Sequence, residues 1–413
     1  MKVLRGRAAA RQVTRLAERG KDTSAAEKAA VPIIRDVRRN GDAAVRKYAQ
    51  RWDKLEDSKP LRIAPEEMHA AWEDLSTDMR AALQQAATRI RQFCRWQMPR
   101  EWNRTANGIR LGQIIRPLES VGCYVPGGQY PLPSTLLMTV IPAEVAGVRA
   151  VRVASPNPQR ATMAAAAMLG VREFYRVGGV QAVAAFAYGT KSIPRVQKIV
   201  GPGNRYVTAA KKLVSSDCAI DMLAGPTEAV ILLHEGTPAF IASDLVAQAE
   251  HDPATLPVLI TRSQALARDV VRQVLAQSAD NPNARAAWEA NGTVLLAASH
   301  EQALEWANQI APEHITVSRE DVSGILSAGS IFIGDYSAQA AGDYATGPNH
   351  VLPTGGGARL RGGLSVLDFV KLITVQELDS EGANHIASTV RRLAELEGLH
   401  AHARSMELRC TYA

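Results

Sequence analysis

The sequence VGCYVPGG at residues 121–128 is a short apolar run that ends in a Pro-Gly-Gly turn. Runs rich in β-branched and aromatic residues and bounded by Gly or Pro are typical of strands. We therefore predict a strand over residues 121–125, followed by a helix over 136–148. The next apolar run predicts a second strand over 151–155. A strand, a helix and a strand in this order favour a parallel sheet with crossover helices.

The same alternation continues along most of the chain. Further strands are predicted at 174–177, 196–200, 229–233, 258–261, 294–297, 315–317 and 331–333. Further helices are predicted at 160–169, 182–188, 205–214, 239–250, 265–277 and 302–310. We predict an α/β protein with two Rossmann-like parallel-sheet domains that divide near Gly225-Pro226. The first 120 residues predict mostly helix, with long amphipathic stretches at 33–48 and 79–98, and the tail after Val366 predicts helix at 386–396.

The composition of the 413 residues is that of an ordinary globular protein with two or three domains, 46% apolar and 22% charged. The net charge is +7, and much of it lies at the N-terminus, in Lys2, Arg5, Arg7, Arg11, Arg15, Arg19 and Lys21. A basic helix of this kind could bind nucleic acid, an anionic membrane or an acidic partner. No recognition motif or aromatic platform accompanies it, so we interpret it as a solvated helix face and expect no nucleic-acid partner.

Two observations favour a cytoplasmic protein. The N-terminus has no apolar segment of the kind found in secretion signals, and no apolar run approaches the length of a membrane span. Cys94, Cys123, Cys218 and Cys410 lie far apart, and no two of them form a Cys-x-x-Cys pair. A disulfide framework or a thiolate zinc site is therefore not expected.

Gln248 and His251 lie three residues apart near the end of a predicted helix that Pro253 must soon stop. Residues at this spacing share a helix face, so an amide oxygen and an imidazole nitrogen can point together. Such a pair can bind a metal or a polar substrate. A polar helix tip without a ligand is the alternative interpretation.

Three further polar clusters follow along the chain. Glu313-His314 lies between a predicted helix and strand and is a candidate acid/base pair. Residues 341–350 predict an irregular Gly-rich loop after a strand end, where ligands collect in open α/β sheets. Its Asp343 is either a metal ligand or a turn former, and its His350 is a candidate substrate contact. Residues 397–402 hold His400 and His402, which would not share a helix face.

The sequence has four Gly-rich segments, three of which lie where a predicted strand gives way to a helix. They include residues 126–128, 178–181, 201–204 and 225–227. Backbone N–H groups in such turns can bind the phosphates of a nucleotide. None has the G-x-G-x-x-G spacing of the dinucleotide fingerprint, and ordinary βα turns would explain them as well.

Together, and in this order, these segments resemble the histidinol dehydrogenase family. The resemblance runs from about Ile33 to about His402. Its most specific stretches are 124–128, 198–204 and 220–228, and it also includes 248–251, 311–314, 341–352 and 397–402. The resemblance implies oxidation of L-histidinol to L-histidine through an aldehyde in two NAD-dependent steps. An alternative is a related dehydrogenase of another polar diol, such as sulfopropanediol, but the carboxylate of Glu397 would repel a sulfonate.

The resemblance also implies roles for particular residues. By their match to the family's motifs, the zinc ligands are Gln248, His251, Asp343 and His402, and zinc holds the substrate's imidazole and amine. His314 corresponds to the general base, and Glu313 to the carboxylate that activates the hydrating water. Substrate contacts are implied for Thr227, Gln248, His251, His314, Asp343, His350, Glu397 and His402. Contacts with NAD are implied for Tyr124, Gln181 and Asn204.

Family members are homodimers whose C-terminal tails cross to the partner, so His402 and Glu397 would complete the other subunit's site. On this basis we expect a helical extension (1–21), a catalytic zinc domain (22–123 with 228–365), an NAD-contacting domain (124–227) and a helical tail (366–413). The sequence departs from the family at three positions. Thr227 replaces a frequent Ser, Asp252 a common Gly, and Gln129 a frequently basic residue.

Overall fold

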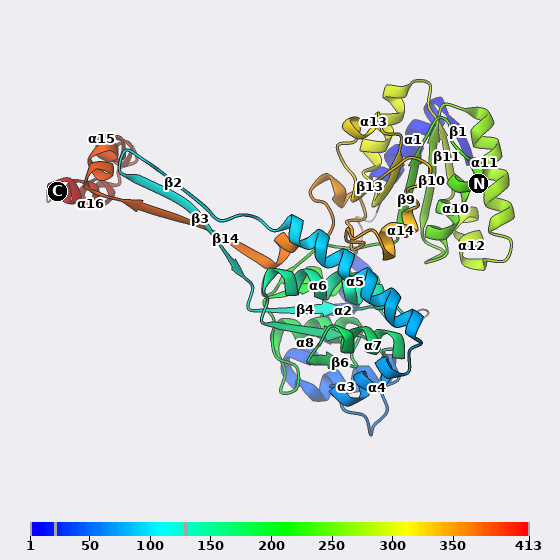
Figure 1. The fold of residues 1–413 in the computed structure, drawn as a ribbon, viewed down its shortest axis with the longest axis horizontal. Coiled ribbons are helices and arrows are strands. Elements are labelled where there is room, and N and C mark those ends of the chain that lie inside the picture. Colours follow the sequence, from blue (N-terminus) through cyan, green and yellow to red (C-terminus); the bar gives the residue numbers. More distant parts are fainter. Residues whose placement is uncertain (1, 20–22, 128–130, 412–413) are drawn as a thin grey trace.

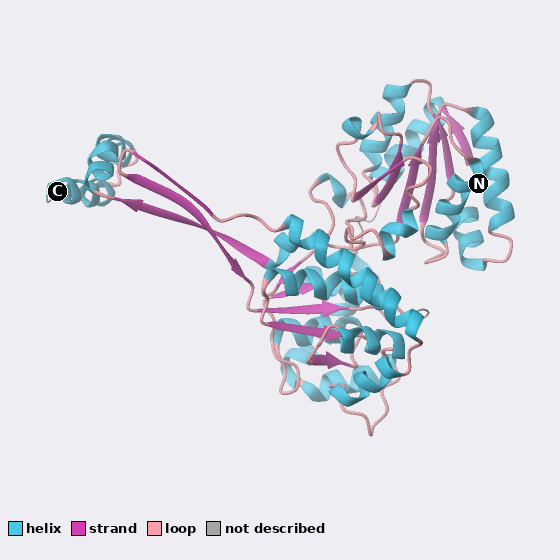
Figure 2. Ribbon diagram, in the orientation of Figure 1, coloured by secondary structure: helices cyan, strands magenta, loops and turns pink. Residues whose placement is uncertain are grey.

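The computed structural model describes residues 2–19, 23–127 and 131–411. It contains two parallel sheets flanked by helices, and a long antiparallel arm that projects away from them (Figures 1 and 2). The predicted α/β class with two parallel-sheet domains is confirmed. Gln129 lies outside the described residues.

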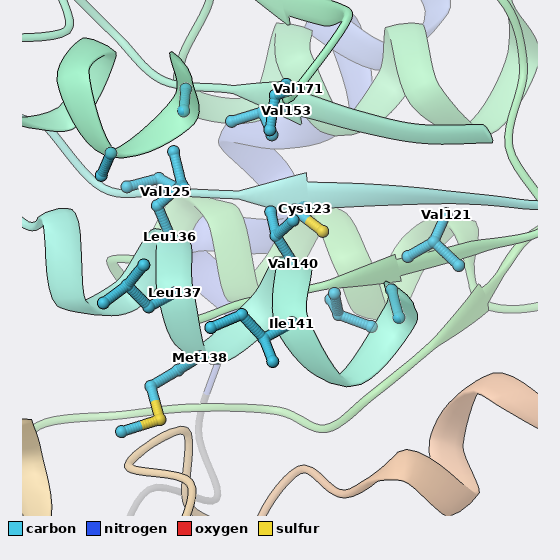
Figure 3. Packing of buried hydrophobic residues seen from close by; sticks show 14 of the residues in the cluster. Val121, Cys123, Val125, Leu136, Leu137, Met138, Val140, Ile141, Val153 and Val171 are labelled. Carbon is cyan, nitrogen blue, oxygen red and sulfur yellow. The ribbon is translucent and has the colours of Figure 1, made fainter. Parts of the chain in front are cut away.

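The first parallel sheet has five strands in the order β6-β5-β4-β7-β8. They are β4 (Ser120–Tyr124), β5 (Ala150–Ala154), β6 (Glu173–Tyr175), β7 (Lys198–Val200) and β8 (Ala219–Ile220). Helices α6 (Pro133–Ala146), α7 (Arg160–Met168), α8 (Gly179–Tyr188) and α9 (Arg205–Val214) connect them. Figure 3 shows side chains of α6, among them Leu136 and Val140, near Cys123 and Val153 of the sheet. Both faces of the sheet are covered, which explains why its strands are continuous apolar runs.

The second parallel sheet has six strands in the order β1-β11-β10-β9-β12-β13. They are β1 (Lys2–Arg5), β9 (Glu228–Leu232), β10 (Leu256–Thr261), β11 (Thr293–Leu296), β12 (His314–Val317) and β13 (Ser330–Ile333). Its helices are α1 (Gly6–Ala17), α10 (Pro238–Ala249), α11 (Gln264–Gln277), α12 (Pro282–Asn291), α13 (His300–Ile310) and α14 (Gln339–Tyr344). Apolar residues of α1 and α13 pack on one face, and those of α10 and α11 on the other.

The N-terminal segment differs from the predicted helical extension. Its first residues form β1, which pairs with β11 at the edge of the six-stranded sheet. Helix α1 then packs on the same sheet through Ala9, Val13 and Leu16. Its basic residues Arg5, Arg7, Arg11 and Arg15 are exposed, as expected for a solvated face. The four-residue strand is too short to be recognised from its own sequence, because its pairing partner lies almost 300 residues away.

Residues 24–97 also differ from the predicted division of the chain. Helices α2 (Ser24–Asn40), α3 (Asp42–Asp53), α4 (Pro65–Glu73) and α5 (Thr77–Gln97) pack against the helices of the five-stranded sheet. We had grouped them with the six-stranded sheet. The amphipathic stretch at 33–48 is two helices, because Gly41 adopts a φ of 53° between them.

The arm consists of two segments that are distant in sequence. Strands β2 (Trp102–Ala106) and β3 (Ile109–Pro117) form a hairpin, and β14 (Val370–Leu378) pairs antiparallel with β3. Helices α15 (Ser380–Leu396) and α16 (His400–Thr411) lie at its tip (Figure 1). The helix at 386–396 is confirmed, but β14 was missed. Eight of its nine residues are exposed, so burial imposes no alternating pattern on them.

Short 3₁₀ helices at Val322–Gly324, Gly357–Arg359 and Val366–Phe369 complete the described elements. Among the described residues, no helix is both long and apolar enough to cross a membrane. All four cysteines are free thiols.

Candidate active site

A buried histidine lies between two carboxylates at the start of β12. His314 is 3% exposed, with Nδ1 3.7 Å from Oε2 of Glu313 and Nε2 3.8 Å from Oδ1 of Asp343. Its ring stacks against Phe332 of β13. Ala311, in the left-handed conformation, ends α13 and turns the chain into β12. Burial lowers the pKa of His314, but the two carboxylates outweigh this effect and raise the pKa overall.

Glu313 is held from the neighbouring strand. Its Oε2 accepts a hydrogen bond of 3.0 Å from the backbone N–H of Glu228, and Glu228 Oε2 lies 3.3 Å from the backbone N of Glu313, which donates to it. Thr227 immediately precedes Glu228 and is partly exposed. Burial raises the pKa of Glu313 to about 8. A carboxyl group with a pKa near neutrality is suited to general base catalysis.

Asp343 is the second carboxylate beside His314, and it also contacts Gln248. The amide Nε2 of Gln248 donates to Oδ2 of Asp343 at 3.0 Å. Burial raises the pKa of Asp343, but its interactions with His314, His350 and Gln248 lower it overall. One turn before Gln248, Asp244 lies on the same face of α10, and burial raises its pKa to about 6.

Two expectations about this region were wrong. Asp343 lies in helix α14, not in an irregular loop. The cluster also lies at the amino ends of β9 and β12, whereas we had expected the carboxyl ends, where ligands commonly collect. The C-terminal ends of α10 and α14 reach this amino edge, because crossover helices run antiparallel to the strands. Their last turns therefore bring Gln248 and Asp343 to His314.

His350 joins the cluster to the domain of the five-stranded sheet. Its Nδ1 lies 2.9 Å from the carbonyl oxygen of Asp343, and its Nε2 lies 3.3 Å from Thr135 Oγ1 on α6. Burial lowers the pKa of His350 overall, although Asp343 raises it, and the charges of His314 and His251 lower it further. The structure thus brings Gln248, Asp343, His314 and His350 together at the junction of the two domains, with His251 nearby.

The donor atoms present fit a borderline cation such as zinc. The Gln248 nitrogen is used in the bond to Asp343, so its oxygen is the atom that can face a cation. His251 lies just after the end of α10 and is exposed, so its ring can reach a ligand. Amide, carboxylate and imidazole groups are compatible with zinc. The described residues of one chain contain no cluster of three His, Cys, Asp or Glu residues that could hold a metal.

His402 and Glu397 do not join this cluster within the chain. Both are exposed, His402 on α16 and Glu397 at the end of α15. These helices lie at the tip of the arm, far from the six-stranded sheet (Figure 1). One chain therefore lacks two of the predicted site residues around His314.

The residues predicted to contact NAD lie at the carboxyl edge of the five-stranded sheet. Tyr124 ends β4 and Asn204 follows the adjacent strand β7, which is where the strand order reverses. Nucleotides bind at such switch points in open α/β sheets. Gly201 has a φ of 116°, and a Cβ there would lie 2.1 Å from the Tyr124 carbonyl oxygen. Only glycine permits this close approach.

The side chains at this edge are largely engaged within the protein. Tyr124 Oη accepts a hydrogen bond from the Gly179 backbone N–H, and Asn204 caps α9. Gln181 is fully buried, and its Nε2 donates to Asp53 Oδ2 at 3.1 Å. Asp53 Oδ2 also accepts from the Gly178 backbone N–H at 2.8 Å. Asp53, at the end of α3, thus supports the loop that starts α8.

The buried carboxyl group of Asp53 should make stability depend on pH. Burial raises its pKa to about 6 in the folded protein. The folded state therefore binds a proton more tightly than the unfolded state, so stability is lost as pH rises from about 4 through about 6. We compare the free energy of unfolding of Asp53→Asn with that of the native chain. The variant should gain about 1–3 kcal/mol relative to the native chain when the pH is raised from about 4 to about 7.5. Urea unfolding of both chains at the two pH values measures this, and a pH-independent difference would contradict it.

Several residues at the site were missed in the sequence. Glu228 contacts Glu313, Thr135 contacts His350, and Arg19 forms an ion pair with Glu228. Glu228 ends the specific stretch at 220–228, but no role was predicted for it, and Thr135 and Arg19 lie outside the motifs. Asp244 could have been found, because it lies four residues before Gln248 on the same predicted helix. Arg19, Glu228 and Thr135 are recognised only by their tertiary contacts, which a single sequence does not show.

Comparison with known proteins identifies the family. The family model for histidinol dehydrogenase matches residues 16–410. A histidinol dehydrogenase of Methanothermobacter thermautotrophicus is 44% identical over 97% of each chain, and one of Thermus thermophilus is 45% identical over 91% of this chain and 93% of its own. The crystal structure of histidinol dehydrogenase from Elizabethkingia anophelis superposes with a TM-score of 0.93 at 32% identity, over 100% of this chain and 98% of that one. The chain therefore belongs to the histidinol dehydrogenase family of enzymes.

Proposed function

We propose that this protein oxidises L-histidinol to L-histidine through histidinaldehyde, with zinc and two molecules of NAD, as the last steps of histidine biosynthesis. The observation that carries the proposal is the position of His314 between Glu313 and Asp343, with Gln248 bound to Asp343. This arrangement joins a candidate acid/base pair to candidate cation ligands in one buried cluster. L-histidinol is proposed as the substrate because the similar proteins are named histidinol dehydrogenases.

Gln248, His251 and Asp343 of one chain would hold the zinc, together with His402. When bound, zinc holds the imidazole and amine nitrogens of the substrate, and NAD takes up a hydride in each oxidation. Thr227 and His350 border the cluster and are the residues that would contact the substrate beside it. Glu397 carries a negative charge that would pair with a cationic nitrogen of histidinol.

His314 would act as the general base in both oxidations. In the first, its ring nitrogen accepts the proton of the substrate hydroxyl as the carbon is oxidised to the aldehyde. Glu313 then accepts a proton from the water that adds to the aldehyde carbon, forming a hydrate. In the second oxidation His314 accepts a hydroxyl proton of this hydrate, and the carboxylic acid forms. Burial of both side chains excludes bulk water from these proton transfers.

Tyr124, Gln181 and Asn204 would form the NAD site at the switch point of the five-stranded sheet. Tyr124 ends β4 and Asn204 follows the adjacent strand β7, which supports a place for both at this site. Asn204 is exposed, whereas the Tyr124 side chain is buried and its hydroxyl accepts from the Gly179 backbone N–H. Gln181 is buried, so its contribution would be to hold the loop at Gly178-Gly179 through Asp53.

The arm supports a homodimer with exchanged tails. It exposes apolar side chains on β14 and on its helices, including Leu372, Ile373 and Leu396. A second copy of the chain would bury them, and its His402 and Glu397 would complete the site that one chain leaves open. Extended arms that exchange identical elements are a common basis for dimers.

The activity is tested by following NADH formation with L-histidinol, NAD and zinc. We expect two NADH per histidinol, loss of activity on chelation, and recovery with zinc. A sulfonated propanediol serves as the comparison substrate and should give no NADH. Absence of histidinol oxidation at saturating zinc and NAD would refute the proposal.

Tail exchange is tested by complementation between two inactive chains. We expect His402→Ala and His314→Ala to be inactive alone, and to regain up to about a quarter of native activity when mixed and refolded together. In such a heterodimer, one of the two sites would have both native residues only if the tail comes from the partner. Heterodimers that form without any activity would argue for a site completed within one chain.

A further inference from the structure

The basic N-terminal segment reaches the candidate active site through Arg19. Its guanidinium forms an ion pair with Glu228 in which Nε faces one carboxylate oxygen and Nη2 the other. The two side chains are 11% and 3% exposed. Nη1 donates to the carbonyl oxygens of Leu16 and Ile310, the latter at 2.9 Å. Arg19 therefore connects the end of α1, the end of α13 and the start of β9.

Glu228 connects this ion pair to Glu313. Its Oε2 accepts from the Glu313 backbone N–H, while its own backbone N–H donates to the Glu313 carboxylate. Its Oε1 accepts from the Gly355 backbone N–H at 2.8 Å. The two strands are thus joined at Glu313 by a reciprocal pair of backbone–side-chain hydrogen bonds. These hydrogen bonds bring the carboxylates of Glu228 and Glu313, both buried, close together.

Two carboxylates in such a place cannot both stay ionised without compensation. The Arg19 guanidinium supplies a positive charge next to Glu228 with the planar geometry that matches a carboxylate. It also binds the last carbonyl of α13, three residues before Glu313. The contacts of Arg19 with Glu228 and with the Ile310 carbonyl oxygen therefore both help to fix the position of Glu313.

We propose that Arg19 is a positioning residue for Glu313, acting through Glu228 and the end of α13. Arg19 holds the Glu228 carboxylate in place through two N–H groups, and that carboxylate holds the backbone of Glu313. This inference rests on the proposed function, in which Glu313 activates the water that hydrates the aldehyde. His314 contacts Glu313, but it is also held by Asp343 and Phe332, which Arg19 does not touch. Removal of Arg19 should therefore affect the second oxidation more than the first.

The test compares the two oxidations in Arg19→Met and Arg19→Lys chains with zinc bound. Oxidation of histidinol is followed with a carbonyl-trapping reagent, so that only the first step is counted, and oxidation of histidinaldehyde is measured directly. We expect Arg19→Met to lower kcat for the aldehyde at least tenfold, to lower the alcohol step less than threefold, and to leave the KM for histidinol unchanged. Arg19→Lys should recover part of the loss, because it keeps the charge but not the paired geometry.

Arg15→Met is the matched control, because Arg15 lies on the exposed face of the same segment. It should leave both steps unchanged. A further variant, Arg19→Met with Glu228→Gln, removes the uncompensated charge and should oxidise the aldehyde faster than Arg19→Met alone. If Arg19→Met does not fold, Arg19→Lys and the double variant carry the same comparison with the native chain.

An equal loss of both steps in every folded variant, or no loss in any, would overturn the role of Arg19. The native chain separates this result from failure of the proposed function. If the native chain oxidises histidinol and histidinaldehyde while the Arg19 variants lose both steps equally, only the positioning role is wrong. If the native chain oxidises neither, the proposed function is wrong and the inference falls with it.

Discussion

Replacement of His314 by Ala should lower kcat for histidinol by about 10²- to 10⁴-fold, the range expected for loss of a general base. His314 is 3% exposed and lies 3.7 and 3.8 Å from two carboxylates. Its Nδ1 has no hydrogen-bond partner among the described residues, so this ring is not saturated by structural bonds. Once the ring is gone, no side chain occupies the position between the two carboxylates from which His314 would accept the substrate proton.

Steady-state kinetics and zinc content of the purified variant measure this effect. The zinc content should remain near that of the native protein, because His314 is not one of the proposed ligands. His69→Ala is the matched control, since His69 is an exposed histidine on α4 and should leave kcat unchanged. A His314→Ala chain that retains zinc and more than a tenth of the native kcat would show that another group accepts the proton.

Replacement of Lys211 by Met should destabilise the domain of the five-stranded sheet by about 3–5 kcal/mol, the cost of leaving a buried charge without its partner. Lys211 on α9 is 1% exposed and forms an ion pair with Asp221, which follows β8. Its Nζ also donates to the Gly201 carbonyl oxygen at 2.9 Å. Asp221 accepts from the backbone N–H groups of Gly201 and Met222. The ion pair therefore holds the loop that would contact NAD.

The neighbouring residue provides the control for this prediction. Lys212 forms an ion pair with Glu27, but its side chain is 47% exposed, so Lys212→Met should cost about 1 kcal/mol or less. Urea unfolding followed by circular dichroism compares the two variants. The double variant Lys211→Met with Asp221→Asn should lose less free energy of unfolding than the sum of the two single variants. The reason is that each single change already removes the same ion pair. A loss in Lys211→Met no larger than that in Lys212→Met would contradict the prediction.

Much of the fold could be predicted because it depends on local patterns. Apolar runs at 121–125, 258–261 and 294–297 are strands because both faces of each sheet are covered, and Gly and Pro mark their ends. Five of the residues for which site roles were predicted lie in one cluster: Gln248, Glu313, His314, Asp343 and His350. For the strands and helices, the signal lies within a few residues of the element that it predicts, whereas the site residues were linked only by the resemblance to the family.

The predictions that failed concern contacts between distant segments. Strand β1 forms by pairing with β11, and β14 forms by pairing with β3 of the hairpin. The grouping of α2 to α5 with the five-stranded sheet likewise depends on surfaces far along the chain. None of these pairings leaves a periodic pattern strong enough to be recognised in the short segments involved.

The sequence by itself determined the α/β class, the two parallel-sheet units and, through the order of its polar motifs, the resemblance to the histidinol dehydrogenase family. Only the tertiary structure decided which edge of the six-stranded sheet carries His314, and that the helix ends of α10 and α14 reach it. The tertiary structure also places Arg19, one of seven basic residues near the N-terminus, in a largely buried ion pair with Glu228 and not on a solvated face. The physical reason is that burial and charge pairing depend on which surfaces meet, and a linear pattern does not specify where distant surfaces meet.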